Sequence, residues 1–363
     1  MEWLSYSTVN NNTILPVLGT LGAGTILSNV IRGRTRLGVF TIGRLALCSG
    51  LAALPYWLME TYPVHDPLKS AVLVTGSSSG IGKETSIRYA EKGYTVLATV
   101  RKDEDMKRLQ STKAEMNFKG EIIPIRLDVT NMNQVKQLSK TIQETTDKPL
   151  VGVVLNQGIV GNSLPLEYTP AENVGLVENV NVQGSINVLQ NVLHLIRQNN
   201  GRVIITGSMV GKVHLGSFQY TRSKVDLEVF ADTLRREMRM LHDAFPQKKV
   251  SVSLLEVGIL QTEIMKKNTD IDIEGIKADH AAKNDDYLWD YHLEQRESVR
   301  KSTEIALKNA QPVATVGPAM IHALCDPIPL PRYVVGVDAR IVLALGYLLP
   351  DLALDAILSK KEK

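Results

Sequence analysis

The sequence predicts an α/β protein with a doubly wound parallel sheet, and three observations favour this fold. From about residue 70 onward, short apolar runs of strand length alternate with longer helical patterns. The first run ends in a glycine-rich turn, and a helical pattern follows that turn directly. Short, continuously apolar runs are typical of strands that are covered on both faces. Their alternation with helices predicts successive βαβ units and therefore a parallel sheet.

The predicted elements follow one another without an internal repeat. Strands are expected at residues 71–75, 95–100, 122–127, 151–155, 202–206, 250–255 and 333–337. Helices are expected at residues 83–92, 104–115, 132–145, 171–197 and 219–241. Gly93 stands where the first helix needs a C-cap. These elements predict one domain over residues 70–340, preceded by a proline-containing linker at 61–69.

The composition limits the classes of function. With 363 residues, the chain is long enough for one large α/β domain and an appendage. Its formal net charge of +3 gives no large basic surplus, so no nucleic-acid partner is expected. The two cysteines, Cys48 and Cys325, are far apart and lack the spacing of metal ligands. Neither a disulfide framework nor a metal site is therefore predicted.

Residues 1–60 differ in composition from the rest of the chain. Residues 14–31 carry no charge, and residues 37–59 are apolar apart from Arg44. A basic stretch at 32–36 separates them, and each is near the length that crosses a bilayer. We therefore predict an N-terminal membrane-anchoring segment. A pair of buried or interfacial helices packed on the soluble domain is the alternative.

The turn after the first predicted strand carries glycines with the spacing G-x-x-x-G-x-G, at Gly76, Gly80 and Gly82. Glycines let a backbone turn sharply and approach a bulky anion closely. The N-terminus of the following helix offers free N–H groups and a positive dipole end. The turn is therefore a candidate cradle for a pyrophosphate group, although such turns are common and the pattern alone is not specific.

A second pattern, farther along the chain, is typical of proton transfer. Tyr220 and Lys224 are four residues apart on a predicted helix and share one face of it. An ammonium group beside a phenol favours the phenolate, so we expect the Tyr220 pKa to be lowered. Ser208 lies twelve residues before Tyr220, just past a predicted strand, where its hydroxyl could hold a substrate oxygen. Such a group can catalyse the interconversion of an alcohol and a carbonyl.

With these motifs in order, the sequence resembles the short-chain dehydrogenase/reductase family over about residues 70–265, and more weakly to its end. The resemblance implies a Rossmann fold and a nicotinamide cofactor. It assigns cofactor contacts to Gly76, Ser78, Ser79, Gly80, Ile81, Gly82, Asp128, Val129, Asn156, Gly158, Tyr220, Lys224 and Thr262. Leu155 and Gln157 depart from the family's Asn-Asn-Ala-Gly motif, and Val257 stands where the family has proline.

The resemblance also implies a mechanism. Hydride passes to or from the nicotinamide while Tyr220 donates or accepts the hydroxyl proton. Ser208 orients the substrate oxygen, and Lys224 tunes Tyr220 and binds the nicotinamide ribose. Asn181 matches the residue that holds a proton-relay water near the lysine. The family further implies a homodimer or homotetramer.

The end of the second predicted strand favours NADP(H), with NAD(H) possible. Arg101 stands there, where a forked guanidinium can bind the 2′-phosphate of the adenosine ribose. In the alternative interpretation Arg101 is an exposed charge, and Asp103 binds the ribose as NAD requires.

The C-terminal part indicates the substrate class. Residues 331–339 resemble the C-terminus of a branch that includes retinol, hydroxysteroid and 3-hydroxybutyrate dehydrogenases. Most members of that branch are bound to membranes, so we expect a lipophilic alcohol or ketone such as a retinoid or steroid. A small hydroxy acid remains an alternative, as does a non-catalytic nucleotide-binding scaffold. Residues 266–303 are a possible substrate lid or a solvated pair of helices.

The last residues of the chain favour a particular cellular location. Residues 341–363 are predicted to form an apolar helix and a basic tail. Lys360 and Lys361 resemble a dilysine signal, which retrieves membrane proteins to the endoplasmic reticulum and must face the cytosol. With the basic stretch at 32–36 also cytosolic, we expect an endoplasmic-reticulum membrane protein with its catalytic domain in the cytosol.

Overall fold

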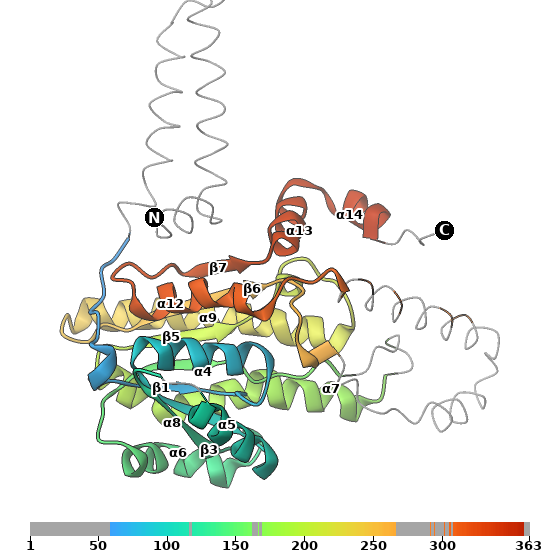
Figure 1. The fold of residues 1–363 in the computed structure, drawn as a ribbon. Helices are drawn as coiled ribbons and strands as arrows, with labels where there is room; N and C mark the ends of the chain where they lie inside the picture. Colours follow the sequence, from blue (N-terminus) through green and yellow to red (C-terminus); the bar gives the residue numbers. More distant parts are fainter. Residues whose placement is uncertain are drawn as a thin grey trace, which may run out of the picture. The chain divides into compact units, whose positions relative to one another are not determined.

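The computed structural model describes residues 59–115, 118–161, 166, 169–265, 291, 294, 301, 305 and 308–358. The chain divides into two compact units, Met1–Tyr62 and Pro63–Lys363, and the labelled elements of Figure 1 belong to the second. Almost all of the predicted membrane-anchoring segment lies outside the described residues. So do most of the predicted lid and the last five residues of the tail.

A seven-stranded, wholly parallel sheet forms the centre of this unit, with the strand order β3-β2-β1-β4-β5-β6-β7 (Figure 1). Its strands are β1 (Ala71–Val74), β2 (Thr95–Val100), β3 (Glu121–Arg126), β4 (Leu150–Leu155), β5 (Arg202–Thr206), β6 (Ser251–Val257) and β7 (Arg332–Val335). The strand order reverses direction between β1 and β4. The predicted doubly wound parallel sheet is therefore confirmed.

Helices cover both faces of the sheet. They are α4 (Gly80–Lys92), α5 (Asp103–Glu115), α6 (Met132–Thr145), α7 (Ala171–Glu178), α8 (Gly184–Gln198), α9 (Phe218–Ala244), α12 (Gly317–Cys325), α13 (Val337–Leu348) and α14 (Asp351–Leu358). Helices α4 and α12 pack together, and the Tyr89 hydroxyl of α4 donates to the Met320 carbonyl of α12 at 2.9 Å. Helices α6, α8 and α9 supply the core on the other face.

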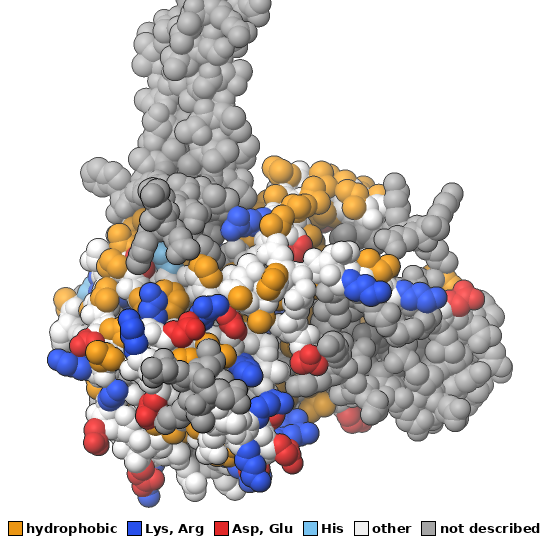
Figure 2. Space-filling view, viewed as in Figure 1, with side chains coloured by type: hydrophobic (Ala, Val, Ile, Leu, Met, Phe, Trp, Pro, Cys, Tyr) orange, Lys and Arg blue, Asp and Glu red, His pale blue; other side chains and the backbone are white. Residues whose placement is uncertain are grey.

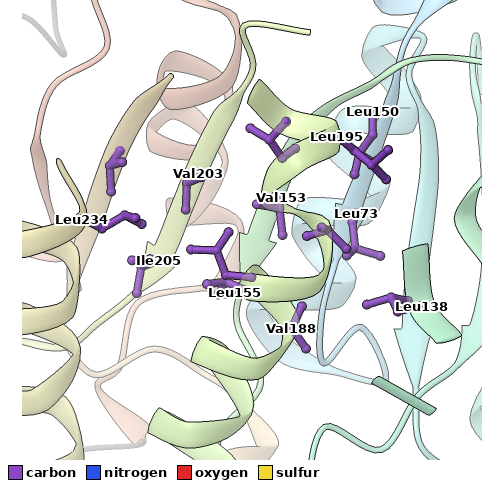
Figure 3. Close-up of a cluster of buried hydrophobic side chains, with 14 of the residues drawn as sticks. Leu73, Leu138, Leu150, Val153, Leu155, Val188, Leu195, Val203, Ile205 and Leu234 are labelled. Carbon is purple, nitrogen blue, oxygen red and sulfur yellow. The ribbon is translucent and has the colours of Figure 1, made fainter. Parts of the chain in front are cut away.

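That core explains why the strands are continuously apolar. Side chains of β1, β4 and β5 meet those of α6, α8 and α9 in one buried cluster (Figure 3). Its members include Leu73, Leu138, Val153, Leu155, Val188, Leu195, Val203, Ile205 and Leu234. Helices α4 and α12 cover the other face of these strands. Apolar residues therefore fill the middle of β1, β4 and β5, and polar residues that could form a site lie at the strand ends.

Two predicted helices differ from the observed ones. The helix expected over residues 171–197 is three pieces, because a π-helical segment, η4 (Asn179–Gln183), separates α7 from α8. The apolar tail forms two helices, α13 and α14, because the chain becomes extended at Leu349 before Pro350. Among the helices that the structure describes, none is both long enough and apolar enough to cross a bilayer.

Candidate active site

The carboxyl ends of strands β1 to β6 border one cavity of about 1650 Å³. It lies where the strand order reverses between β1 and β4, the position at which open α/β sheets bind their ligands. The structure brings most of the predicted site residues to its wall. These are Gly76, Ser78, Ser79, Gly80, Ile81, Arg101, Asp128, Val129, Asn156, Gly158, Ser208, Tyr220, Lys224 and Thr262. Gly82 and Asn181 are not part of this wall.

The glycine turn has a backbone that only glycine accommodates. Gly76 and Gly80 have φ angles of 66° and 56°. A Cβ atom at Gly82 would lie 2.3 Å from the Gly76 carbonyl oxygen, and one at Gly76 would lie 2.8 Å from the Cα of Gln157. The turn therefore leaves the first N–H groups of α4 accessible to the cavity without side chains in the way. This geometry suits a pyrophosphate group at the helix N-terminus.

Polar bonds hold the neighbouring walls of the cavity. The Asn156 side-chain amide donates to the carbonyl oxygens of Thr75 and Gly76, at 3.2 and 3.3 Å. The Asp128 carboxylate accepts from the backbone N–H and the hydroxyl of Thr130, at 2.9 and 2.6 Å. Gly158 is placed so that a Cβ atom would contact the Asn181 side chain at 3.4 Å. These hydrogen bonds hold the Asn156 and Asp128 side chains in place where the strand order reverses.

Positive side chains gather at the end of the cavity next to β2. Arg101, Lys102 and Arg108 all line it. Arg108 donates to the Ser78 carbonyl oxygen of the glycine turn at 2.6 Å, and to Asp105 at 2.6 Å. Asp103, the alternative ribose ligand, is paired with Arg126 at 3.2 Å and is not part of the cavity wall. Arg108 was not predicted, because nothing in the sequence places α5 beside the glycine turn.

Ser208, Tyr220 and Lys224 lie together at another end of the cavity. Ser208 lies two residues past the end of β5 and caps the short helix η5 (Met209–Gly211), and it forms a side-chain hydrogen bond with Tyr220. Lys224 is 4% exposed, and its Nζ donates to the Thr206 carbonyl oxygen at 3.0 Å. The same Nζ lies 5.5 Å from the centre of the Tyr220 ring. The phenol and the Ser208 hydroxyl are thus hydrogen-bonded to each other, and the ammonium group lies beside the phenol ring.

Asn181 lies in the π-helical segment behind this group. Its side-chain oxygen accepts from the Ile159 N–H at 2.8 Å, and its Nδ2 donates to the Ile159 carbonyl oxygen and to Ser223 Oγ, each at 2.9 Å. Ser223 Oγ in turn donates to the Tyr220 carbonyl oxygen at 2.7 Å. Asn181 therefore connects the wall after β4 to the helix that carries Tyr220. π-Helical turns of this kind are frequent at functional sites.

Gln157 has a role that the sequence did not indicate. Its Oε1 accepts from the Thr75 hydroxyl, and its Nε2 donates to Ser185 Oγ at 2.7 Å and to the Val180 carbonyl oxygen at 3.4 Å. The side chain thus joins the end of β1 to the π-helical segment and α8. In the sequence, Gln157 was visible only as a departure from a family motif.

Comparison with known proteins identifies the family. A family model described as short chain dehydrogenase matches residues 70–272, which is more than half of the chain. The chain belongs to the short-chain dehydrogenase family. Members of this family are oxidoreductases that bind NAD(P), and the cradle, the cavity and the Tyr-Lys-Ser group described above fit that cofactor.

Two relatives of this short-chain dehydrogenase match it over most of their length. Human retinol dehydrogenase 16 is 28% identical over 325 residues, covering 86% of this chain and 95% of the relative. Rat 17-beta-hydroxysteroid dehydrogenase type 6 is 28% identical over 313 residues, covering 85% and 94%. These matches confirm the retinol and hydroxysteroid branch that the C-terminal residues indicated.

Solved structures confirm the fold of the dehydrogenase. A Burkholderia phymatum short chain dehydrogenase/reductase in complex with NAD superposes with a TM-score of 0.62 at 18% identity, covering 82% of this chain and 98% of the other. Levodione reductase superposes with a TM-score of 0.58 at 19% identity, covering 76% and 98%. At such identities the likeness concerns the fold alone.

The electrostatics of the dehydrogenase site correct one expectation. Burial raises the pKa of Tyr220 to about 12, and the hydrogen bond with Ser208 offsets only part of that rise. Burial also lowers the pKa of Lys224 to about 8. The predicted lowering of the Tyr220 pKa is therefore wrong for the protein alone. The reason is geometric, because the Lys224 ammonium donates to a backbone carbonyl rather than to the phenol.

Replacing Lys224 by methionine should change how stability depends on pH. Without cofactor, Lys224 has a pKa of about 8 when folded and of about 10.5 when unfolded, so the unfolded chain binds more protons between these values. The unfolding free energy of the wild type should rise relative to Lys224→Met as the pH increases from 8 to 10.5, by about 1–3 kcal/mol. Urea denaturation at both pH values measures this. Exposed Lys140→Met is the control, and pH profiles of Lys224→Met and wild type that run parallel would contradict the assignment.

Proposed function

We propose that the protein transfers a hydride between a nicotinamide cofactor and the carbinol or carbonyl carbon of a lipophilic alcohol or ketone, such as a retinoid or steroid. The proposal rests on one observation. Ser208, Tyr220 and Lys224 line the same cavity as the glycine turn, so a dinucleotide bound at the turn would extend toward the proton-transfer group.

In the proposed reaction, each residue of the site would have a separate role. The nicotinamide would supply or accept the hydride. Ser208 would hold the substrate oxygen by a hydrogen bond, and Tyr220 would donate its phenol proton to that oxygen in reduction or accept a proton from it in oxidation. Lys224, whose Nζ lies 5.5 Å from the centre of the Tyr220 ring, would bind the nicotinamide ribose. Asn181 would fix the helix of Tyr220 through Ser223.

The cofactor that we propose is NADP(H) rather than NAD(H). Arg101, Lys102 and Arg108 line the end of the cavity next to β2, where the ribose 2′-phosphate would bind. A phosphate among cationic side chains is stabilised by charge-assisted hydrogen bonds. Asp103, which an NAD-binding protein would use for the ribose, already pairs with Arg126. Asp105 also lines this end of the cavity, but its carboxylate is paired with Arg108 at 2.6 Å, so Arg101 and Lys102 are the cations that we propose for the 2′-phosphate.

The lining of the cavity on the side of Tyr220 supports a lipophilic substrate. Apolar side chains predominate there, namely Ile159, Val160, Leu166, Leu215, Phe218 and Ile264. A small hydroxy acid would need a free cation for its carboxylate. Arg222 lines the cavity, but it pairs with Glu178 at 3.0 Å and with Asp226 at 3.7 Å. The lipophilic class is therefore favoured over the hydroxy-acid alternative.

We further propose that the protein acts at the endoplasmic-reticulum membrane, with its catalytic domain in the cytosol. Exposed apolar side chains gather over α13 and α14 (Figure 2). They include Ile341, Leu345, Tyr347, Leu348, Leu352 and Ile357, and Leu352 is 85% exposed. A contiguous apolar surface of this kind is costly in water and suits the interface of a bilayer. Substrates that partition into the bilayer would then be close to the cavity.

The Tyr220→Phe variant should separate an enzyme from a nucleotide-binding scaffold. Removing the phenol leaves no proton donor at the substrate oxygen, so kcat should fall by about 100-fold or more. The dissociation constant for NADPH should stay within about twofold, because the ring remains in place. NADPH oxidation with retinoid and steroid carbonyls gives kcat, and protein fluorescence gives the dissociation constant. Tyr347→Phe, on the exposed surface of α13, is the matched control. Equal turnover by Tyr220→Phe and wild type would refute the mechanism.

The Arg101→Ala variant should distinguish the cofactors. Losing a charge-assisted hydrogen bond to the 2′-phosphate should raise the KM for NADPH by about 10- to 100-fold. The KM for NADH should change by no more than about twofold, since NADH lacks that phosphate. Steady-state kinetics with both cofactors measure the two ratios. Arg236→Ala, an exposed arginine of α9 outside the cavity wall, is the control. A similar rise in both KM values would overturn the NADP assignment.

A fluorophore attached at position 352 should report contact with lipid. The native Cys48 and Cys325 are first replaced by serine, and the label is placed on Leu352→Cys of the full chain in phosphatidylcholine–phosphatidylserine vesicles. Its emission should shift to the blue and be quenched by brominated lipid, because the apolar surface enters the interface. A label on Met240→Cys, an exposed position of α9, should remain unquenched. Equal quenching at both positions, or at neither, would contradict docking by α13 and α14.

A further inference from the structure

The loop that follows β6 forms one wall of the cavity. Val257, Gly258, Ile259, Leu260 and Thr262 all line it. The loop also approaches the glycine turn, since a Cβ atom at Gly80 would lie 3.2 Å from the Thr262 methyl group. At its far end, the Gln261 N–H donates to the Gln311 carbonyl oxygen at 2.9 Å. The loop has no proline after β6 to restrict its backbone, so its shape must be fixed by contacts from elsewhere in the chain.

Asp338 supplies such a contact from the C-terminal part of the chain. It lies in the first turn of α13, where a carboxylate is favoured by the helix dipole. Its Oδ2 accepts from the Ile259 N–H at 2.6 Å, across 79 residues of sequence. The N-cap of α13 is Gly336, which has no side chain, and the hydrogen bond of the Asp338 carboxylate goes to the loop and not to the helix N-terminus. The hydrogen-bonding capacity of Asp338 is therefore directed to the cavity loop.

Two glycines make room for this carboxylate. A Cβ atom at Gly258 would lie 2.3 Å from Asp338 Oδ1, and one at Gly336 would lie 2.5 Å from the same oxygen. Gly336 also has a φ angle of 109°, which turns the chain sharply from β7 into α13. Asp338 Oδ1 is buried and has no hydrogen-bond partner among the residues that the structure describes. The side chain thus lies between the loop and its own turn and is in close contact with both.

The rest of the segment from β7 to α13 is attached to the same site. Ala339 and Leu343 of α13 share a buried cluster with Met209 and Val210, which directly follow Ser208, and Tyr220 packs against that cluster. Arg332, at the start of β7, pairs with Glu228, Asp232 and Glu256. Glu228 and Asp232 belong to α9, the helix of Tyr220, and Glu256 belongs to β6. Arg332 thus ties the start of β7 to α9 and β6, and Asp338 ties the start of α13 to the loop after β6.

We propose that Asp338 is a positioning residue for the cofactor, which fixes the loop from Gly258 to Thr262 against the nicotinamide half of the dinucleotide. The proposal rests on the proposed function, because it takes the occupant of the cavity to be a nicotinamide dinucleotide. It accounts for how a loop with Val257 in place of a proline could keep a fixed shape. A carboxylate from a distant helix supplies the restraint that a rigid residue would otherwise give.

The first test compares whole and partial cofactors. With Asp338→Ala, the dissociation constant for NADPH should rise about tenfold, because the Ile259 N–H loses its acceptor and the loop moves. The dissociation constant for the adenosine bisphosphate half of NADPH, which lacks nicotinamide, should change less than twofold. Asp338→Asn retains an acceptor oxygen and should restore most of the NADPH affinity. Equal affinities of Asp338→Ala and wild type for NADPH, or equal losses for both ligands, would overturn the proposal.

The second test does not depend on cofactor or activity. Hydrogen–deuterium exchange of the segment 257–262 should be slow in the wild type and in Asp338→Asn, and at least tenfold faster in Asp338→Ala. In Gly258→Ala the new methyl group clashes with the carboxylate, so exchange should again be fast. The double variant Gly258→Ala with Asp338→Ala removes the clashing atoms, and its exchange should be no faster than that of Asp338→Ala alone. Additive effects, or unchanged exchange in Asp338→Ala, would refute the positioning role. A wild type that binds no nicotinamide cofactor, yet shows this exchange pattern, would instead refute the proposed function.

Discussion

The site depends on the close approach of two turns at the point where the sheet reverses its strand order. The turn after β1 and the turn after β4 come so near that a Cβ atom at Gly76 would lie 2.8 Å from the Gln157 Cα, and one at Gly82 would lie 2.5 Å from Asn156 Nδ2. Asn156 then ties the two turns together by donating to the backbone of the first. The N-terminus of α4 can face the cavity only because this approach leaves it uncovered.

Hydrogen bonds extend from this point to the proton-transfer group. They run in sequence through Thr75, Gln157, Ser185, Asn181, Ser223 and the Tyr220 backbone. Asn181 and Ser185 are almost completely buried, and a buried polar group is costly to leave without a partner. The glycine turn and the helix of Tyr220 are therefore held at a fixed separation. The π-helical segment contributes to this, because it brings Asn181 and Ser185 into the same network.

The sequence predicted the features that are encoded locally and missed those that arise from distant contacts. The seven strands were predicted within a few residues, since each is a short apolar run that ends at a turn. The residues of the glycine turn and the Tyr-Lys pair were found by their spacing. Arg108 and Gln157 were not, because the partners that give them these roles lie 23–82 residues away in the sequence. The π-helical segment was predicted as plain helix, since an apolar pattern does not record one extra residue per turn. The direction of the Tyr220 pKa was wrong because burial outweighs a lysine that points elsewhere.

Helix α13 has one face against the cavity loop and another that is exposed, and the sequence did not show that the two are connected. Its inner face carries Asp338 and Leu343, which contact the cavity loop and the cluster around Tyr220. Its outer face carries Ile341 and Leu348, which are exposed. One helix thus carries both the exposed apolar side chains and the carboxylate that bonds the loop after β6. If the apolar surface docks on a bilayer as proposed, the loop that walls the cavity would lie one helix away from the lipid.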